Sequence, residues 1–466
     1  MGACRSGIRA NGDRLLPPLC GDKVNIDERQ ARLLKLTSID FRSTEQFVEE
    51  PFIVSRAEGL YYWDTEGKRY FDAIGGIFAA SLGHGHPRVL EAMRRQMEQL
   101  SFAPPMHGIA DVTLDFVERL GSVTPENLNF VKPFSGGSES IEAAMKFTRQ
   151  YFKQTGQPEK YKFVSRYQGY HGGTFGAMAA SGTGKRKTPF EPQMGGFLKV
   201  FSPTYYRDRF SCWEECNRFC ARMFEDVILS EDPRTVAGVI VEPIGNTGGT
   251  VTPTDEYFQI LRQICDEYEV LLIFDEIITG YGRTGNMFAA QTFGVTPDIL
   301  CGGKGLSSGA VPLGAMIARE NLGDAFYGSE AEDVNFAHGH TFAGNPLASA
   351  VGIAVIDEIV DNDLAQGAQE LGVYLVDKLR GLEKYGVVRE IRGKGLLRGV
   401  ELMREGEPCP ELGVALKKTA LDNGLVMRID PLWFAVAPAL IVGKDDIDEL
   451  YGLVEQSVTD ALAVLD

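Results

Sequence analysis

The sequence predicts an α/β protein with a large domain built on a mostly parallel sheet and a second, smaller α+β domain. The chain has 466 residues, which is more than one hydrophobic core usually serves. Between about Pro87 and Ala343, helical patterns alternate with short apolar strands, and each strand is followed by a glycine-bearing turn. Such alternation is typical of parallel strands with helices on both faces of the sheet. After Ala343 the alternation stops, which indicates the second domain.

The N-terminal segment, residues 1–86, is expected to form an arm and to complete part of the smaller domain. Its first 45 residues are polar and irregular, which favours a mobile arm with a short helix near Asp27–Leu36. The stretch "YYWDTEGKRYFDA" reads as a small hairpin that turns at Glu66-Gly67.

The large domain is predicted over residues 87–343 and the C-terminal small domain over residues 344–466. The predicted strands of the large domain include "KYKFVSR", "VAGVIVEP", "VLLIFDE" and "VPLGAMIA". In the small domain a long helix precedes the strand-like stretches "GVVREIRGKGLLRGVEL" and "GLVMRI". In a parallel sheet ligands bind at the carboxyl ends of the strands, so the large domain is expected to carry the site.

Composition and charge exclude several classes of function. The net charge of −17 argues against nucleic acid or an anionic membrane as a partner. No apolar run approaches the roughly 20 residues that span a bilayer, and no secretory leader opens the chain, so a cytoplasmic location is expected. Cys212, Cys216 and Cys220 are spaced to share one helix face, but without a CxxC pair or a nearby histidine they predict reduced, structural cysteines and no metal site.

The stretch "LLIFDEIITGYGRTG" raises the question of why a buried strand should end in two acids. Leu271–Phe274 are apolar and bounded by turn signals, as in a fully buried strand. Desolvating a carboxylate at the end of such a strand costs several kcal/mol of free energy unless the carboxylate contacts a cation or a strong hydrogen-bond donor, on the order of magnitude usual for buried charges. One alternative is that one of Asp275 and Glu276 caps the chain while the other faces water. The other is that an acid is buried against a bound cation.

Other strand ends favour the second alternative. "PFSGGSESIEAAMKF" places a Gly/Ser turn at the start of a helix, where backbone N–H groups suit a phosphate. "SRYQGYHGGT" offers Tyr170 and His171 between glycines, and an aromatic ring there can stack on a flat ligand. "DILCGGKGLSSG" places Lys304 among small residues, where partial desolvation lowers its pKa and favours imine formation.

A phosphate cradle, a stacking ring, a carboxylate and an imine-forming lysine together suit pyridoxal 5′-phosphate. This cofactor requires a lysine and an acid that keeps its pyridine nitrogen protonated. Asp275 can be buried because a pyridinium pairs with it. No GxGxxG follows a strand and "GGKGLSSG" lacks the P-loop spacing, so neither NAD nor a nucleoside triphosphate is favoured.

From about Tyr62 to the C-terminus the chain resembles the class III (omega) aminotransferases of the fold type I pyridoxal-phosphate superfamily. The motifs that carry the resemblance are "YFDAIGGIFAASLGHGHP", "SGGSES", "GYHGGT", "VEP", "FDEIITGYGRTG", "PDILCGGKGLSSGAVPLGA" and "HTFAGNPLASA". The resemblance implies that Lys304 is the Schiff-base lysine and Asp275 the partner of the pyridine nitrogen. It implies a cofactor site made of Gly137, Ser138, Tyr170, Glu242, Asp275, Ile277, Lys304 and Thr341, with Tyr170 and Ile277 on opposite ring faces and Gly137 and Ser138 at the phosphate.

The resemblance also implies a homodimer with shared active sites, with a tetramer as the open alternative, because Thr341 resembles the residue that reaches the phosphate of the other subunit. Arg428 resembles the arginine that pairs with a substrate α-carboxylate, and Phe78 falls at an aromatic wall of the substrate pocket. In ornithine- and 4-aminobutyrate-type members an acid pairs with this arginine, but that position is Thr247 here. Arg428 is then expected to swing out or to bind a water or an anion when the substrate lacks a carboxylate, which favours an amine or omega-amino acid donor with pyruvate-like acceptors.

Three functions remain open on these residues. The first is transamination from an amine or omega-amino acid to a 2-oxo acid such as pyruvate. The second is a racemase, epimerase or decarboxylase on the same scaffold, which dependence of turnover on an oxo acid separates from the first. The third is a non-catalytic protein that retains the fold, which the intact Lys304 and Asp275 argue against.

Overall fold

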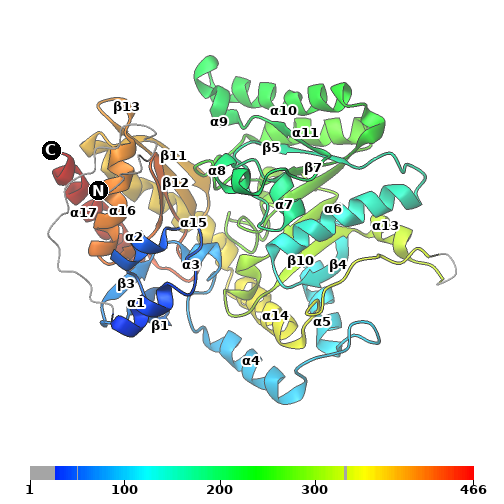
Figure 1. Cartoon of the computed structure of the whole chain (residues 1–466), viewed down its shortest axis with the longest axis horizontal. Coiled ribbons are helices and arrows are strands. Elements are labelled where there is room, and N and C mark those ends of the chain that lie inside the picture. Colours follow the sequence, from blue (N-terminus) through cyan, green and yellow to red (C-terminus); the bar gives the residue numbers. More distant parts are fainter. Residues whose placement is uncertain (1–26, 50, 330–332) are drawn as a thin grey trace, which may run out of the picture.

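The computed structural model describes residues 27–49, 51–329 and 333–466, and they form two lobes (Figure 1). One lobe holds the central part of the chain around a large sheet. The other brings the N-terminal segment together with the C-terminal part (Figure 1). The first 26 residues, which include most of the predicted arm, lie outside the described residues. The short helix predicted near Asp27–Leu36 is confirmed as α1 (Glu28–Leu34), which begins with a capping box between Asp27 and Gln30.

A seven-stranded sheet forms the large lobe, in the order β4-β10-β9-β8-β7-β5-β6. Its strands are β4 (Leu128–Phe134), β5 (Lys162–Arg166), β6 (Phe197–Val200), β7 (Val236–Val241), β8 (Leu271–Asp275), β9 (Ile299–Gly302) and β10 (Gly314–Arg319). The run from β6 to β9 is parallel, whereas β10 is antiparallel to both β4 and β9. The prediction of a mostly parallel sheet is therefore confirmed.

Helices cover both faces of this sheet, which explains why its strands are continuously apolar. Along β8, Leu272 and Phe274 face a cluster that includes helices α10 and α11, while Ile273 faces the cluster of α6. Figure 1 shows α10 and α11 together on one side of the sheet and α6 and α7 on the other. The helices of this lobe are α4 (Pro87–Gln99), α5 (Asp111–Gly121), α6 (Gly137–Gln154), α7 (Phe175–Ala180), α8 (Gly184–Lys187), α9 (Pro203–Tyr206), α10 (Trp213–Ser230), α11 (Asp255–Glu267), α12 (Ala289–Phe293), α13 (Glu320–Gly323) and α14 (Pro346–Asp361).

The second lobe is built on two smaller sheets. The hairpin strands β1 (Val54–Glu58), β2 (Tyr61–Asp64) and β3 (Arg69–Asp72) are joined by β14 (Leu425–Val426), which runs parallel to β3. The N-terminal segment and the C-terminal part therefore share one sheet. The other sheet contains β11 (Val388–Lys394), β12 (Leu397–Arg404), β13 (Glu407–Pro408), β15 (Arg428–Asp430) and β16 (Trp433–Val436).

The helices of the second lobe are α2 (Thr44–Glu49), α3 (Gly75–Phe78), α15 (Leu364–Leu379), α16 (Pro410–Asp422) and α17 (Lys444–Leu465). The long helix expected after residue 344 is in fact two helices, α14 and α15, because the chain turns at Asp363 with a left-handed φ of 50°. Helix α14 packs against α4 and α5 below the large sheet (Figure 1). The domain boundaries at residues 86 and 343 stay a prediction.

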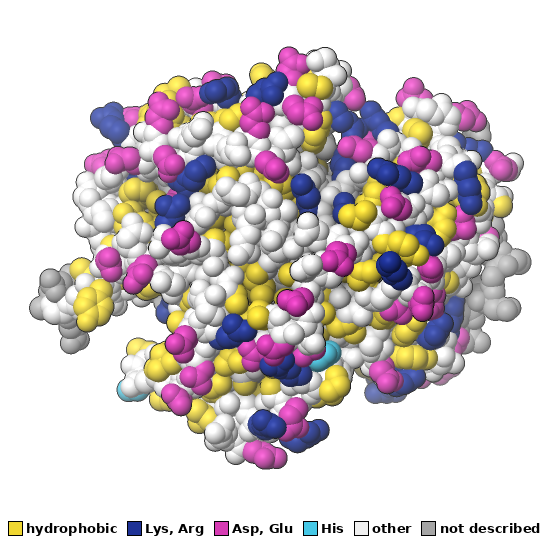
Figure 2. Space-filling view, turned by 180° about the vertical axis from the view of Figure 1, so that it is seen from behind, with side chains coloured by type: hydrophobic (Ala, Val, Ile, Leu, Met, Phe, Trp, Pro, Cys, Tyr) yellow, Lys and Arg dark blue, Asp and Glu magenta, His cyan; other side chains and the backbone are white. Residues whose placement is uncertain are grey.

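The surface and the cysteines fit the analysis of composition, with one correction. On the face drawn in Figure 2, acidic and basic side chains are interspersed. Within the described ranges, none of the helices has the length and apolar character needed to cross a membrane. Cys216 and Cys220 are buried in α10, but Cys212 is exposed and precedes the helix in an extended conformation, so the prediction that all three share one helix face is wrong. No group of three or more His, Cys, Asp or Glu in the described part of the chain is placed to hold a metal ion.

Candidate active site

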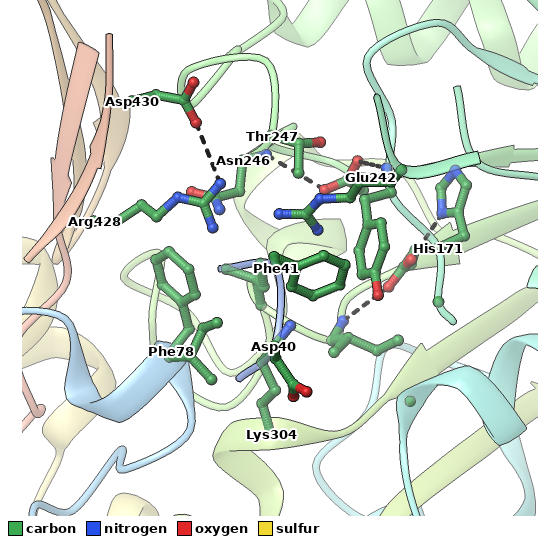
Figure 3. A pocket seen from close by; sticks show the side chains of 18 of the residues that line it. Asp40, Phe41, Phe78, His171, Glu242, Asn246, Thr247, Lys304, Arg428 and Asp430 are labelled. Carbon is green, nitrogen blue, oxygen red and sulfur yellow. Dashed lines mark hydrogen bonds and ion pairs between the residues drawn. The ribbon is translucent and has the colours of Figure 1, made fainter. Parts of the chain in front are cut away.

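A cavity of about 930 Å³ opens between the two lobes, at the carboxyl ends of β5, β7 and β8. Figure 3 shows that side chains from distant parts of the sequence meet there. Asp40 and Phe41 come from the N-terminal segment, Lys304 from the loop after β9, and Arg428 from β15. The strand-end position agrees with the site expected for such a sheet.

Asp275 is the last residue of β8, and its carboxylate is 4% exposed. One oxygen, Oδ2, lies 2.8 Å from Nδ1 of the buried His171, and the other accepts a hydrogen bond from the backbone N–H of Ile277 at 3.2 Å. The His171 backbone N–H in turn donates to Ser181 Oγ at 2.8 Å, which fixes the loop that carries the ring. The carboxylate is thus held in place at the edge of the cavity.

Glu276 is fully buried and is not among the residues that line the cavity. Its two oxygens accept hydrogen bonds from the backbone N–H groups of Ala289 and Ala290 and from Thr279 Oγ1, at 2.6 to 2.9 Å. Burial raises the pKa of Glu276 to about 7, and these donors oppose the rise. The alternative that one of the two acids faces water is therefore wrong, because both are buried and Glu276 anchors the first turn of α12.

Lys304 opens a short 3-10 turn directly after β9 and is partly buried at the cavity. Its backbone has a φ of 40°, a strained value for a residue with a side chain. Burial lowers the pKa of its amine, and the negative charges of Asp275 and Glu242 partly oppose that shift. Within the described residues its amine forms neither a hydrogen bond nor an ion pair. The predicted desolvation of this lysine is therefore confirmed.

The Gly/Ser turn forms another part of the cavity wall, at the N-terminus of the 18-residue helix α6. The first N–H groups of a helix have no partner within it, so they are available to an anion. The turn packs closely: a Cβ on Gly137 would lie 2.5 Å from Cδ1 of Ile277, and one on Gly303 would lie 3.3 Å from Gly137. Ser138 Oγ accepts a hydrogen bond from the Gly173 N–H at 3.1 Å.

Glu242 and Tyr170 are coupled at the same wall. The Glu242 carboxylate is 5% exposed and accepts hydrogen bonds from the backbone N–H groups of Tyr170 at 3.0 Å and Asn246 at 3.3 Å. Burial raises the pKa of Glu242. It therefore ties the loop of Tyr170 to the end of β7.

Arg428 has an acid partner, although none stands at Thr247. Arg428 Nη2 lies 3.4 Å from Asp430 Oδ2, two residues along β15 (Figure 3). Thr247 lines the cavity and donates its hydroxyl to the Gln168 carbonyl at 2.6 Å. Arg428 therefore has an acid partner that the sequence analysis did not name, and its behaviour with a substrate that lacks a carboxylate stays a prediction.

Phe78 lines the same cavity and is 2% exposed. Its φ is 65°, and the preceding Gly76 also has a positive φ of 71°. The Asp72 carboxylate accepts the Gly76 N–H at 2.7 Å and thereby holds this kinked turn. Phe78 is kept at the wall by a strained but hydrogen-bonded backbone.

The structure brings together all the predicted site residues except one. Those that line the cavity are Phe78, Gly137, Ser138, Tyr170, Glu242, Asp275, Ile277, Lys304 and Arg428. Thr341 is exposed and is not among the lining residues. The lining residues that were missed as parts of the site include Asp40, Phe41, Arg186 and Asp430. The basic run "GKRK" was the one available signal for Arg186, whereas Asp40 and Phe41 lie in a segment that has no periodic pattern.

Comparison with known proteins agrees with this arrangement over nearly the whole chain. The family described as aminotransferase class-III matches residues 43–458. A probable aminotransferase of Mycobacterium tuberculosis is 37% identical over 427 residues, covering 89% of this chain and 90% of that protein. A beta-alanine–pyruvate aminotransferase of Pseudomonas aeruginosa is 30% identical over 426 residues, covering 90% and 94%.

Two solved structures are similar over both lobes. An (S)-enantioselective omega-transaminase from Thermomicrobium roseum has a TM-score of 0.89 and 34% identity, and the match covers 94% of this chain and all of that one. An amine transaminase from an uncultivated Pseudomonas species, in its PLP-bound form, has a TM-score of 0.87 and 30% identity, with 91% and 98% covered.

Proposed function

Because this chain belongs to the class III aminotransferases, we propose that it moves an amino group from an amine or omega-amino acid to a 2-oxo acid such as pyruvate. It is a pyridoxal-phosphate-dependent aminotransferase with the fold type I architecture. A relative named for beta-alanine and pyruvate supports the choice of donor and acceptor.

One observation carries the assignment of the chemistry. The Lys304 amine has no partner in the described part of the chain, its pKa is lowered by burial, and it lines the same cavity as the buried Asp275. An unprotonated amine is the form that attacks a carbonyl or takes up a proton. The proposed role of Lys304 is to bind the cofactor covalently and then to move a proton.

The lining residues fit pyridoxal phosphate. Gly137, the first residue of α6, has no side chain, and a Cβ there would strike Ile277; the backbone N–H groups at this helix start are therefore open to a phosphate. When bound, the cofactor supplies an electrophilic carbon for amines and a ring that withdraws electrons from the reacting centre. Tyr170 and Ile277 are proposed to pack on the two faces of that ring, and Ser138 to donate at the phosphate.

Asp275 is proposed to hold a proton on the cofactor's ring nitrogen. Its oxygen Oδ2 is fixed by His171, and a carboxylate that cannot rotate keeps its charge aimed at one point. Glu242 orients Tyr170 through the backbone and excludes water from that wall. Phe78 and Arg428 are proposed to bind the substrate, with Arg428 at the carboxylate of the oxo acid.

We also propose a homodimer in which Thr341 of the partner subunit completes the phosphate site. Thr341 is exposed, and beside it Phe342 is 60% exposed and packs edge-on against Phe102 at 6.1 Å. Exposed aromatic residues of this kind are enriched at protein interfaces. The free thiols of the six described cysteines support the expected cytoplasmic location, since a reducing compartment keeps them free.

The experiment that tests the function is a two-substrate assay with the purified holoenzyme. Beta-alanine or n-propylamine is supplied with and without pyruvate, and alanine is measured by chromatography. Alanine is expected only when both a donor and pyruvate are present. Formation of ethylamine from beta-alanine without pyruvate would instead support the decarboxylase alternative, and interconversion of L- and D-alanine without an oxo acid would support the racemase or epimerase alternative.

A further inference from the structure

Arg42 and Arg186 line the cavity together with Arg428, and Arg186 is held in a fixed orientation by two aromatic rings. It lies in the short helix α8, and its guanidinium carbon is 4.3 Å from the centre of the Phe41 ring and 4.7 Å from that of Tyr170. A guanidinium that stacks on rings uses its flat faces and keeps its N–H groups along the edge. The stack therefore leaves donors on Arg186 for another group.

Within the described residues, no acid lies within ion-pair distance of Arg186, although it is partly buried. Burial lowers its pKa most, the positive charge of Arg428 lowers it further, and Tyr170 and the charge of Asp430 partly oppose that shift. Both arginines also lower the pKa of the Lys304 amine. Two cations therefore lie close enough to interact with each other and with the reacting amine, and of these two only Arg428 has an acid within ion-pair distance among the described residues.

An unpaired cation in a partly buried cavity is unfavourable unless an anion binds to it. The oxo acid carries one carboxylate, which Arg428 is proposed to bind. Arg186 then has no anion to bind during the acceptor half of the reaction. The donor half can supply one, if the donor carries an anionic group a few bonds away from its amine.

We propose that Arg186 binds the carboxylate or sulfonate of an omega-amino acid donor, a step that rests on the proposed function. Phe41 and Tyr170 hold the guanidinium edge toward the cavity, and Arg428 remains the residue for the oxo acid. The site therefore separates its two anionic substrates between two arginines. Simple amines fit the cavity but leave Arg186 without an anion, so they are the poorer donors.

The test measures the amine half-reaction from the change in cofactor absorbance, with two donors of equal chain length, beta-alanine and n-propylamine. In Arg186→Met the second-order rate constant for beta-alanine is expected to fall roughly tenfold or more, as for loss of a charge-assisted hydrogen bond. The second-order rate constant for n-propylamine is expected to change by less than about threefold, and the second-order rate constant of the pyruvate half-reaction is expected to change as little. Arg186→Lys is expected to recover part of the loss, because it restores the charge without the planar edge.

The matched control is Lys187→Met, which removes the same charge from the same short helix at a residue that does not line the cavity. It is expected to leave the ratio of the two donors unchanged. Phe41→Leu removes one of the two rings that stack on Arg186. It is expected to lower the second-order rate constant for beta-alanine, but by less than Arg186→Met does.

Two results would overturn the proposal while the proposed function stands. One is an equal loss for both donors in Arg186→Met, and the other is a wild-type enzyme that uses n-propylamine as well as beta-alanine. A wild-type enzyme that makes no alanine from either donor and pyruvate would instead contradict the proposed function itself. The proposal would also be overturned if Arg186→Met and Arg186→Lys both lost the cofactor absorbance. That result would show that Arg186 is needed to bind the cofactor.

Discussion

Replacing Arg428 with Ala is expected to weaken binding of the oxo acid and to spare amines that lack a carboxylate. Arg428 lies at the cavity on β15, and its side chain is 22% exposed. Truncating one partner of a buried arginine–carboxylate contact costs roughly 2–5 kcal/mol. At about 1.4 kcal/mol per tenfold change, the KM for pyruvate is expected to rise by roughly 30- to 5000-fold.

Asp430 gives this prediction a second arm with the opposite sign. It competes with the substrate for Arg428 at 3.4 Å, but its own side chain is 43% exposed, so the pair contributes only ~0.2–1 kcal/mol. Asp430→Asn is therefore expected to lower the KM for pyruvate, by less than about fivefold. Thr247→Glu adds an acid to the same cavity wall and is expected to raise that KM.

The assay follows the two half-reactions separately. The pyridoxamine form of each variant is mixed with pyruvate, and the pyridoxal form with n-propylamine, and each is monitored by absorbance. Equal losses in both half-reactions for Arg428→Ala would show that the arginine is structural. A rise in the KM for pyruvate in Asp430→Asn would show that Asp430 orients Arg428 and does not compete with the substrate.

Three further predictions concern the cofactor site and its supports. Asp275→Ala is expected to lower turnover by several orders of magnitude. His171→Leu is expected to lower turnover by less, roughly 5- to 150-fold, because removing one donor from a buried acceptor costs ~1–3 kcal/mol. A larger loss of turnover in His171→Leu than in Asp275→Ala in steady-state assays would contradict this ranking. Thr341→Ala is expected to weaken cofactor retention on dialysis with little change in turnover at saturating cofactor, and a fully active monomer on a sizing column would refute the shared site. The pKa of Glu276 is raised from an ordinary 4.5 to about 7, so between pH 4.5 and pH 7 the folded protein binds more protons than the unfolded chain. The free energy of unfolding is therefore expected to fall as the pH rises through this range. In denaturant titrations at several pH values, Glu276→Leu should show a smaller fall of the free energy of unfolding than the wild type.

The position of the strand-end residues at the cavity could be predicted from the sequence, because each of those residues lies in a local pattern. Asp275 follows an apolar run, Lys304 lies among glycines and Gly137 begins an amphipathic helix. The parallel sheet then places such strand ends at one edge, where the cavity lies.

Residues that reach the site by tertiary contact could not be predicted in the same way. Phe41 and Arg186 are 145 positions apart in the sequence and meet only as stacked side chains (186 − 41). Asp430 pairs with Arg428 because the two residues face the same way on β15. The position at which related enzymes carry the acid partner of this arginine is Thr247, which lies on another loop. The burial of Glu276 depends on where α12 begins, and the residue at the N-cap of that helix, Phe288, has no side chain that can cap it.

The most direct measurement of the central claim is the identity of the lysine that binds the cofactor. Reduction of the holoenzyme with borohydride makes the bond between the cofactor and its lysine permanent, and peptide mass spectrometry then locates it. The account predicts that the pyridoxyl group lies on Lys304 alone and that Lys304→Ala removes both the label and turnover while the protein stays folded. A label on Lys185 or Lys417, which also line the cavity, or on Lys199, whose pKa burial lowers to about 7, would contradict it.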